Sequence, residues 1–199
     1  MPKSFPEEKL LQLPDCEIYY FANFLSAEVA NAKFKEFKDC IPWQQDEIKV
    51  FGKVYPQPRL TALFGNNNRP YSYSNITMLP QEFTPSLLAI KKEIETKTDV
   101  EFTSCLLNLY RDGKDSNGWH ADNEKELGEN PVIASVSLGQ ERYFHLKHRS
   151  KKDLKHKMLL EHGSLLLMQG ETQHHWLHQI PKTAKPIGER VNLTFRVIP

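Results

Sequence analysis

Residues 188–198 read "GERVNLTFRVI", and the alternation of polar and apolar side chains in this stretch decides the fold class. Such alternation is typical of a β-strand with two different faces, here expected over 191–198. Arg190 and Arg196 are six positions apart, and an even spacing puts both on the same face of the extended chain. The opposite face is apolar and carries Val191, Leu193, Phe195 and Val197.

Two arginines on one side of a strand inside a β core need anionic partners, because an unpaired buried charge is very unfavourable. A dicarboxylate would suit, since a guanidinium group binds a carboxylate through two parallel hydrogen bonds. Asn108 and Tyr110 alternate in the same way in "LLNLY" and could bind the same ligand. An exposed sheet face with solvated arginines is the alternative, and the strand pattern leaves both open.

Six further segments have the composition of short strands, rich in β-branched, leucine and aromatic residues and bounded by Gly, Pro, Asn or Asp. They are 17–21, 59–64, 104–110, 132–138, 142–146 and 164–168.

Two earlier segments predict helices. In 26–38, Ser26 is a plausible N-cap and Val29, Ala30, Phe34 and Phe37 recur at near-helical spacing; in 84–96, Thr84 can cap and Pro85 occupies the first helical position. Two helices followed by many strands predict an α+β, mostly β fold, with a β-sandwich or closed jelly roll as its core. The 199 residues favour a single domain, 1–199.

Composition excludes several classes of protein. No apolar run approaches the roughly 20 residues of a membrane helix, and the N-terminus has no apolar segment of the kind found in a signal peptide. The three widely spaced cysteines argue against disulfides and fit a reducing compartment. We therefore expect a protein that is not secreted and has no membrane partner, cytoplasmic in a bacterium and nuclear or cytoplasmic in a eukaryote, acting as a monomer.

The polar stretch 117–128, "NGWHADNEKELG", lies between two predicted strands and contains His120 and Asp122. On an extended chain, this spacing puts an imidazole and a carboxylate on one side. The pair also occurs by chance in surface loops. Loops that follow strands can converge at the mouth of a barrel, however, and this context favours a metal site.

A metal held by one His and one carboxylate needs a third ligand, and spacing alone does not identify it. Two His and one carboxylate would form a facial triad, which leaves positions open on Fe(II) for a co-substrate and O₂. The candidates are His145, His148, His156, His162, His174, His175 and His178.

The stretch 145–157, "HLKHRSKKDLKHK", is strongly basic, with Asp153 as its one acidic residue. A solvated loop and a phosphate-contacting patch are both consistent with it. Its cationic residues are Lys147, Arg149, Lys151, Lys152, Lys155 and Lys157.

Five blocks of sequence point together to one known family. They are "LLNLYRDGKDSNGWHADNEKELG" (106–128), "VIASVSLG" (132–139), "EHGSLLLM" (161–168), "HWLHQIP" (175–181) and "RVNLTFR" (190–196). In this order they resemble the AlkB family of Fe(II)- and 2-oxoglutarate-dependent dioxygenases, over roughly residues 40–198. "PRLTALFG" (58–65) followed by "YSYS" (71–74) is similar to the substrate-gripping hairpin of the family's nucleic-acid demethylase branch.

The resemblance implies a double-stranded β-helix core over about 101–199 and a substrate-recognition part over about 40–80. It implies Fe(II) bound by His120, Asp122 and His178. It also implies that 2-oxoglutarate is bound with Arg196 on its distal carboxylate and Arg190 near its metal-chelating end. The full set of implied co-substrate contacts is Asn108, Tyr110, Arg190, Asn192, Thr194 and Arg196.

The resemblance further implies a substrate pocket formed by Trp43, Arg59, Phe64, Tyr71, Tyr73, Asn123 and Glu124. Asn123 stands where the family often has Asp, which puts its contact with a base in doubt. Trp43 and Phe64 could equally be core aromatics.

The implied activity is oxidative demethylation of N-alkylated bases, such as N1-methyladenine and N3-methylcytosine, in DNA. RNA is the second implied substrate. Fe(II) would act as the metal cofactor, and 2-oxoglutarate and O₂ would be consumed as co-substrates. The methyl group would leave as formaldehyde in a DNA-repair reaction. A duplex base must be flipped out to react, whereas single-stranded substrate needs no flipping. An oxygenase acting on a protein or lipid, and a non-enzymatic nucleic-acid reader with the same fold, are the alternatives.

Overall fold

The computed structural model describes residues 8–50, 52–67, 71–73 and 76–198. Its largest feature is an eight-stranded sheet that is antiparallel except for the β5–β8 pair. In spatial order the strands are β1 (Glu8–Leu10), β2 (Glu17–Phe21), β14 (Ser164–Gln169), β11 (Ile133–Gly139), β16 (Arg190–Arg196), β9 (Ser104–Tyr110), β5 (Leu60–Gly65) and β8 (Gln81–Glu82).

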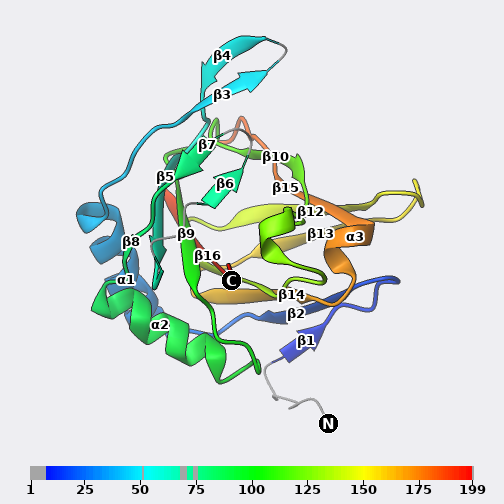
Figure 1. Ribbon diagram of the computed structural model, residues 1–199, viewed down its shortest axis with the longest axis horizontal. Helices are drawn as coiled ribbons and strands as arrows, with labels where there is room; N and C mark the ends of the chain where they lie inside the picture. The colour runs from blue at the N-terminus through cyan, green and yellow to red at the C-terminus, as the bar shows by residue number, and fades with distance from the viewer. Residues whose placement is uncertain (1–7, 51, 68–70, 74–75, 199) are drawn as a thin grey trace.

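A second, four-stranded antiparallel sheet packs against one face of the large sheet (Figure 1). Its strands, in spatial order, are β10 (Asn117–His120), β15 (Trp176–Ile180), β12 (Arg142–His148) and β13 (Lys155–Leu160). The two sheets form the predicted jelly roll, so the expected mostly β fold is confirmed.

Two helices cover the other face of the large sheet (Figure 1): α1 (Ala27–Cys40) and α2 (Pro85–Glu95). Both begin where the sequence predicts, because the Ser26 and Thr84 side chains accept hydrogen bonds from the backbone N–H groups of Val29 and Leu87. Val29 itself is 43% exposed. Its expected place in the apolar stripe is therefore wrong, and α1 contacts the sheet through Ala30 and Phe37 instead.

Strand β16 shows how alternation positions the site. Val191, Leu193 and Phe195 belong to the hydrophobic core between the large sheet and the helices. The intervening polar side chains, from Arg190 to Arg196, therefore point toward the space between the two sheets. A separate hydrophobic core fills the rest of that space and includes Tyr20, Leu106, Phe144, Leu146, Leu166, Met168 and Trp176.

Several short elements were not predicted from local sequence pattern, and among them only the segment 71–74 was expected, from the family resemblance, to belong to a hairpin. The hairpin of β3 (Glu47–Val50) and β4 (Lys53–Pro56) projects away from the two sheets (Figure 1). A smaller hairpin pairs β6 (Tyr71–Tyr73) with β7 (Ile76–Met78). The remaining elements are the four-residue helix α3 (Thr172–His175) and the 3-10 turn η1 (Lys125–Leu127).

The basic stretch 145–157 is a hairpin and not a free loop, because its two ends, 145–147 and 155–157, pair as parts of β12 and β13. No helix within the described ranges is long and apolar enough to cross a membrane.

Candidate functional site

A cavity of about 120 Å³ lies between the two sheets. Apolar side chains from both sheets form part of its wall: Leu106, Ile133, Phe144, Leu160, Leu166, Met168 and Ile180. The polar part of the wall consists of Arg59, Asn108, Tyr110, Asn117, His120, Asp122, Glu124, Ser135, His178, Asn192, Thr194 and Arg196. The cavity thus brings together most of the residues that the sequence motifs single out.

His120, Asp122 and His178 meet at one end of this cavity. Each offers a ligand atom, and the three atoms lie within 4.8 Å of one another. The register between β10 and β15 produces this arrangement, because it places His120 directly opposite His178. Two imidazoles and one carboxylate at this spacing suit a divalent iron ion with open coordination positions.

The hydrogen bonds of His120 assign a lone pair to the nitrogen atom that faces Asp122. Its Nδ1 lies 2.8 Å from the carbonyl oxygen of Gly118. Because a carbonyl oxygen can only accept, the imidazole proton is assigned to Nδ1. Its Nε2 therefore keeps a lone pair, and this atom lies 3.2 Å from Nδ2 of Asn117 and 3.7 Å from Oδ1 of Asp122. A second ring nitrogen bonded to a carbonyl, as here, is typical of metal-binding histidines.

Asp122 is held ionised by Arg196. Burial alone would raise its pKa, but the charge of Arg196, the neighbouring His178 and His120, and the hydrogen bond from Arg196 together outweigh burial and lower the pKa to about 2. The guanidinium donates to Oδ2 of Asp122 from Nη2 at 2.9 Å and from Nε at 3.3 Å. Oδ1 is left facing His120, where a metal would need a carboxylate oxygen.

His178 is buried, and burial lowers its pKa to about 3. Its imidazole is therefore neutral near physiological pH, the form that can bind a metal. Phe144 packs against it, with ring centroids 5.2 Å apart.

Gln173 supports the metal end of the site, and no feature of the sequence pattern marked it. It is fully buried on α3, and its Oε1 accepts a hydrogen bond of 2.9 Å from the backbone N–H of Asp122. The short helix thereby fixes the backbone that carries the carboxylate.

Arg190 supplies buried positive charge at another part of the site. Its Nη2 donates to Oγ of Ser137 at 3.0 Å, and its guanidinium carbon lies 5.2 Å from the ring centroid of Tyr110. Nε and Nη1 are buried and have no hydrogen-bond partner among the residues described. Burial lowers the pKa of Arg190 to about 10, so the group is still protonated near neutral pH. A buried guanidinium with two unused donors fits the carboxylate of an anionic ligand.

The structure places the two arginines the other way round from the expectation, relative to the proposed metal ligands. Arg196, expected at the distal carboxylate, contacts the proposed metal ligand Asp122. Arg190, expected near the metal, lies beside Tyr110 and Ser137. The strand pattern defined their common face but contained no information on which end approaches the metal.

Two serines that the sequence interpretation missed complete this face. Ser137 binds Arg190, and Oγ of Ser135 accepts a hydrogen bond of 3.0 Å from Nδ2 of Asn192. Their alternation with Ala134 and Val136 in "ASVS" was a usable signal, because both serines had to share the face opposite the apolar residues.

Among the expected substrate contacts, Arg59 and Glu124 line the cavity. Arg59 is oriented by its own hydrogen bonds, from Nε to Oδ1 of Asn108 at 2.8 Å and from Nη1 to the carbonyl of Ser116 at 3.2 Å. Asn123 is exposed and does not belong to the cavity wall.

Phe64 and Trp43 do not line the cavity, and both pack in or against the hydrophobic core, the alternative that the sequence left open for them. Phe64 is 2% exposed and belongs to the core beneath the helices, on the other face of the large sheet. Trp43 packs against the same core and donates from Nε1 to the carbonyl of Lys38 at 3.2 Å. The side chains of Tyr71 and Tyr73 lie outside the described residues.

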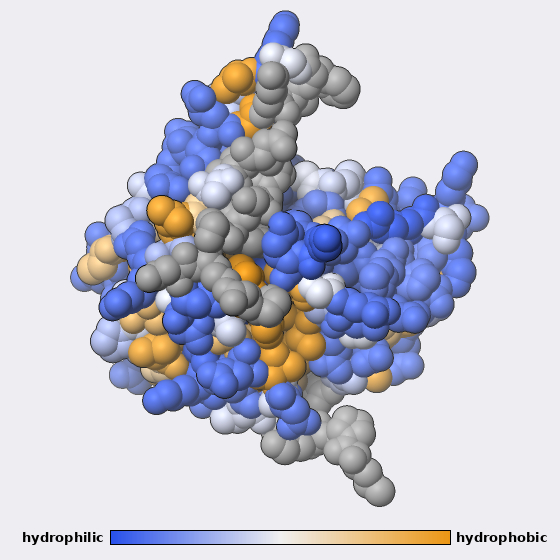
Figure 2. Space-filling model, viewed as in Figure 1, coloured by the Kyte–Doolittle hydropathy of each residue, from blue (hydrophilic) through white to orange (hydrophobic). Residues whose placement is uncertain are grey.

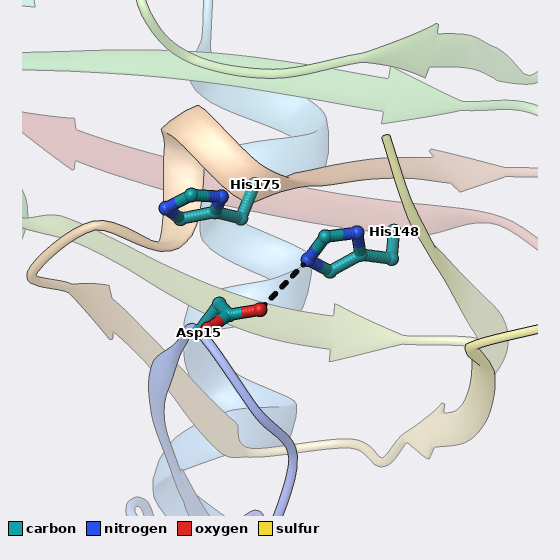
Figure 3. A group of neighbouring side chains, drawn as sticks. All are labelled: Asp15, His148 and His175. Atoms are coloured by element: carbon teal, nitrogen blue, oxygen red, sulfur yellow. Dashed lines mark hydrogen bonds and ion pairs between the residues drawn. The ribbon is translucent and has the colours of Figure 1, made fainter. Parts of the chain in front are cut away.

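A second group of metal-ligand types lies elsewhere in the molecule (Figure 3). Asp15, His148 and His175 offer ligand atoms within 4.8 Å of one another. The hydrogen bonds of this cluster differ from those of the first. Nδ1 of His148 accepts from the backbone N–H groups of Ser150 and Lys151, at 3.2 and 3.0 Å.

These contacts assign the His148 proton to Nε2, which faces Asp15 in Figure 3. Nε2 lies 3.1 Å from Oδ2 of Asp15. The lone pair is on the side away from the cluster, and Lys151 already pairs with Asp15. The group is therefore a structural contact between residue 15 and β12. Nε1 of Trp176 reinforces it with a hydrogen bond of 2.9 Å to the carbonyl of Pro14.

Comparison with known proteins places this geometry in a family. The profile of the 2OG-Fe(II) oxygenase superfamily matches residues 17–196. The chain is 40% identical over 184 residues to alpha-ketoglutarate-dependent dioxygenase alkB homolog 3 of Bos taurus, covering 88% of this chain and 64% of that protein. It is 35% identical over 225 residues to DNA oxidative demethylase ALKBH2 of Arabidopsis thaliana, covering 97% of this chain and 70% of that protein.

The chain spans just under two thirds of the length of the bovine relative, at 64%. A solved structure described as "The structure of OsALKBH1" has the same fold, with a TM-score of 0.69 and 17% identity over 95% of this chain and all of that one. The profile match over 17–196, together with these relatives, shows that the chain belongs to the AlkB family of the 2OG-Fe(II) oxygenase superfamily.

Proposed function

We propose that this chain is an Fe(II)- and 2-oxoglutarate-dependent dioxygenase that removes N-linked methyl groups from nucleic-acid bases, chiefly in alkylated DNA. The observation that carries the proposal is the cavity itself, which joins a facial triad to Tyr110. The Tyr110 ring borders the buried Arg190, whose guanidinium has two unused hydrogen-bond donors. The two relatives above, one named as a dioxygenase and one as a DNA oxidative demethylase, support the choice of reaction and substrate.

In this proposal, His120, Asp122 and His178 hold the iron, and Arg196 keeps Asp122 ionised and oriented. Arg190 and Tyr110 receive the distal carboxylate of 2-oxoglutarate, while Asn108, Asn192 and Thr194 line the path between the two ends. When bound, Fe(II) and 2-oxoglutarate would supply the chemistry that oxidises a C–H bond with O₂, and 2-oxoglutarate would be converted to succinate and CO₂. The chain itself orients these groups and shields them from water.

Arg59 and Glu124 are the described side chains that we assign to the target base, since both line the cavity. Hydrogen-bond donors and acceptors in a cavity can recognise the Watson–Crick edge of a flipped base. We also propose that segment 40–80, with its two hairpins, forms the substrate-recognition part of a single domain.

Positive charges on the outer face of the small sheet support the proposal that the substrate is a polyanion. Strand pairing puts Lys147 opposite Lys155, and each carries an ammonium group. It also puts His145 opposite Lys157, where burial and the charge of Lys157 lower the pKa of the imidazole. Cationic groups directly opposite each other destabilise a sheet slightly unless anions neutralise them. The side of the molecule occupied by the β12–β13 hairpin is predominantly hydrophilic (Figure 2).

Two exposed aromatic rings belong to the same face. Nζ of Lys147 lies 4.3 Å from the ring centroid of Trp119, and Nζ of Lys157 lies 3.6 Å from that of Tyr143. Lysines beside exposed aromatic rings suit a strand of nucleic acid, whose phosphates bind cations and whose bases stack on rings.

The proposal is tested with oligonucleotides that each carry one N1-methyladenine or N3-methylcytosine, as DNA or RNA and single or double stranded. Incubation with Fe(II), 2-oxoglutarate and O₂ is expected to release the methyl group as formaldehyde. The Asp122→Ala variant, as control, should leave the methyl group in place. If 2-oxoglutarate is turned over but no oligonucleotide loses its methyl group, the substrate is of another class, such as a protein or lipid, and the nucleic-acid proposal is wrong.

A further inference from the structure

We infer that Arg142 is a positioning residue for the co-substrate, and that it acts by holding Tyr110 and adding a second positive charge beside Arg190. This inference rests on the proposed use of 2-oxoglutarate. It concerns a residue that lies behind the cavity wall and belongs to neither the metal triad nor the paired arginines of β16.

Arg142, the first residue of β12, is 4% exposed and connects two loops. Its Nη1 donates to the carbonyl of Asp112 at 3.3 Å, and its Nη2 donates to the carbonyls of Asp115 at 2.9 Å and Pro181 at 2.7 Å. One guanidinium therefore ties the loop between β9 and β10 to the end of β15. These three strands carry Tyr110 and the two histidines of the triad.

The same two segments approach closely at a second point. The backbone N–H of Thr183 donates to the carbonyl of Gly113 at 2.8 Å. A Cβ atom on Gly113 would lie 2.5 Å from the carbonyl oxygen of Thr183, so only glycine fits there without a backbone shift. The loop that Arg142 holds is thus docked by backbone contacts as well.

Arg142 also lies beside the ring that separates it from the cavity. Its guanidinium carbon is 5.6 Å from the ring centroid of Tyr110, and that of Arg190 is 5.2 Å from the same centroid. Tyr110 is 1% exposed and lines the cavity. Two buried guanidinium groups therefore border one phenol ring at the end of the cavity away from the metal triad.

Among the described residues, the charge of Arg142 has no carboxylate in direct contact. Its hydrogen bonds given above all go to carbonyl oxygens, and the nearby carboxylate of Asp115 is bound by Arg111 through Nε at 2.8 Å and Nη2 at 2.9 Å. Burial lowers the pKa of Arg142, and burial followed by the charge of Arg142 lowers that of Arg190. This excess of buried positive charge favours a ligand with a second carboxylate over a ligand with only one.

The experiment compares two ligands by calorimetry, with Mn²⁺ in place of iron so that no turnover occurs. One ligand is 2-oxoglutarate, and the other is 2-oxopentanoate, which has the same chelating end but no distal carboxylate. We expect Arg142→Met to weaken 2-oxoglutarate binding about tenfold or more, as the removal of charge interactions of this kind does, and to leave 2-oxopentanoate binding nearly unchanged. Arg142→Lys keeps the charge but loses the fork of donors, so it should retain part of the preference for the dicarboxylate.

Arg111→Gln is the matched control, because Arg111 binds the same loop through Asp115 but its side chain is 42% exposed. It should bind both ligands like the wild type. An equal loss of both ligands in Arg142→Met and Arg142→Lys would mean that the residue only stabilises the fold, and would overturn the inference, as would unchanged binding of both. Failure of the wild type to bind 2-oxoglutarate with Mn²⁺ would instead count against the proposed function.

Discussion

Two groups of one carboxylate and two imidazoles occur among the described residues, and hydrogen bonds to Nδ1 separate their chemistry. In His120, Nδ1 faces a carbonyl, so Nε2 keeps the lone pair that a metal would bind. In His148, Nδ1 accepts backbone N–H groups and Nε2 carries the proton. Residue types alone could not distinguish the two groups, because both offer the same ligands.

This difference predicts how metal binding responds to substitution. Asp122→Ala and His178→Ala each remove a ligand and should abolish tight Mn²⁺ binding measured by calorimetry. His175→Ala removes a member of the second group and should leave both the affinity and the stoichiometry of one metal ion per chain unchanged. A lower stoichiometry in His175→Ala would show that the second group also binds metal, against the tautomer assigned to His148.

Asp115 gives the fold a defined dependence on pH. Burial would raise its pKa, but the hydrogen bonds from the side chain and backbone of Arg111, together with the charges of Arg111 and Arg142, outweigh burial and lower the pKa. A carboxylate with a lowered folded-state pKa stabilises the fold above its unfolded pKa, about 3.9, and loses that contribution as the pH falls through the folded value.

We therefore expect Arg111→Gln to lower the free energy of unfolding near neutral pH by about 0.5–1 kcal/mol, a modest value because Arg111 is partly exposed to solvent. The difference in unfolding free energy between variant and wild type should shrink as the pH falls below the unfolded pKa of about 3.9 and through the lowered folded-state pKa of Asp115, because Asp115 then becomes protonated in both proteins. Urea denaturation of both proteins, from neutral pH down to acid pH, measures this difference in the free energy of unfolding. A gap that stays constant with pH would contradict the assigned ion pair.

At the scale of elements, β16 serves two purposes with its two faces. The apolar face anchors the helices, and the polar face supplies the site. We expect Leu193→Ala, at a fully buried position, to destabilise the fold by about 2–5 kcal/mol, as measured by chemical denaturation. Leu88→Ala on α2, where Leu88 is 38% exposed, is the control and should change stability by less than about 1 kcal/mol. Similar losses in both variants would contradict the assignment of faces.

The sequence predicted the elements with strong local signals, such as both capped helices and the seven strands marked by composition or alternation. It did not predict β10, β13 or β15 as strands. β13 reads "KHKMLL", and its strand character depends on pairing with β12, a contact that no local pattern records. The two-residue strand β8 is too short for periodicity to be visible.

The same limit applies to the site. Alternation assigned Arg190 and Arg196 to one face, and the family resemblance selected His178 from seven histidines. The orientation of the arginines depends on register, since β16 places Arg190 opposite Tyr110 and Arg196 opposite Ser104. The sequence left Phe64 open between pocket and core, because a motif identifies a position and not the face of the sheet on which its side chain lies.

At the scale of the whole molecule, the helices, the large sheet and the small sheet have different functions. Helices support one face of the large sheet, and the small sheet packs against the other face (Figure 1). The cavity lies between the two sheets, and the basic face lies on the outer side of the small sheet. This arrangement allows substrate affinity to change without alteration of the site for iron and 2-oxoglutarate.

The basic face therefore makes a separate prediction. We expect Lys155→Gln with Lys157→Gln to weaken binding of a long unmethylated oligonucleotide and to reduce the dependence of log affinity on log salt by about one for each phosphate that the two lysines neutralise. Fluorescence anisotropy at several salt concentrations measures both. The control is Lys35→Gln with Lys92→Gln, which removes the same charge from exposed positions on the helices. An equal effect of both pairs would indicate that only net charge matters.

The central claim is that 2-oxoglutarate turnover is coupled to methyl removal in one cavity. The direct measurement quantifies succinate and repaired base together, by mass spectrometry, after incubation of the protein with Fe(II), O₂, 2-oxoglutarate and an N1-methyladenine oligonucleotide. We predict equal amounts of succinate and repaired base, with neither product formed by Asp122→Ala. Methyl removal without succinate, or by Asp122→Ala as well as by wild type, would contradict the claim.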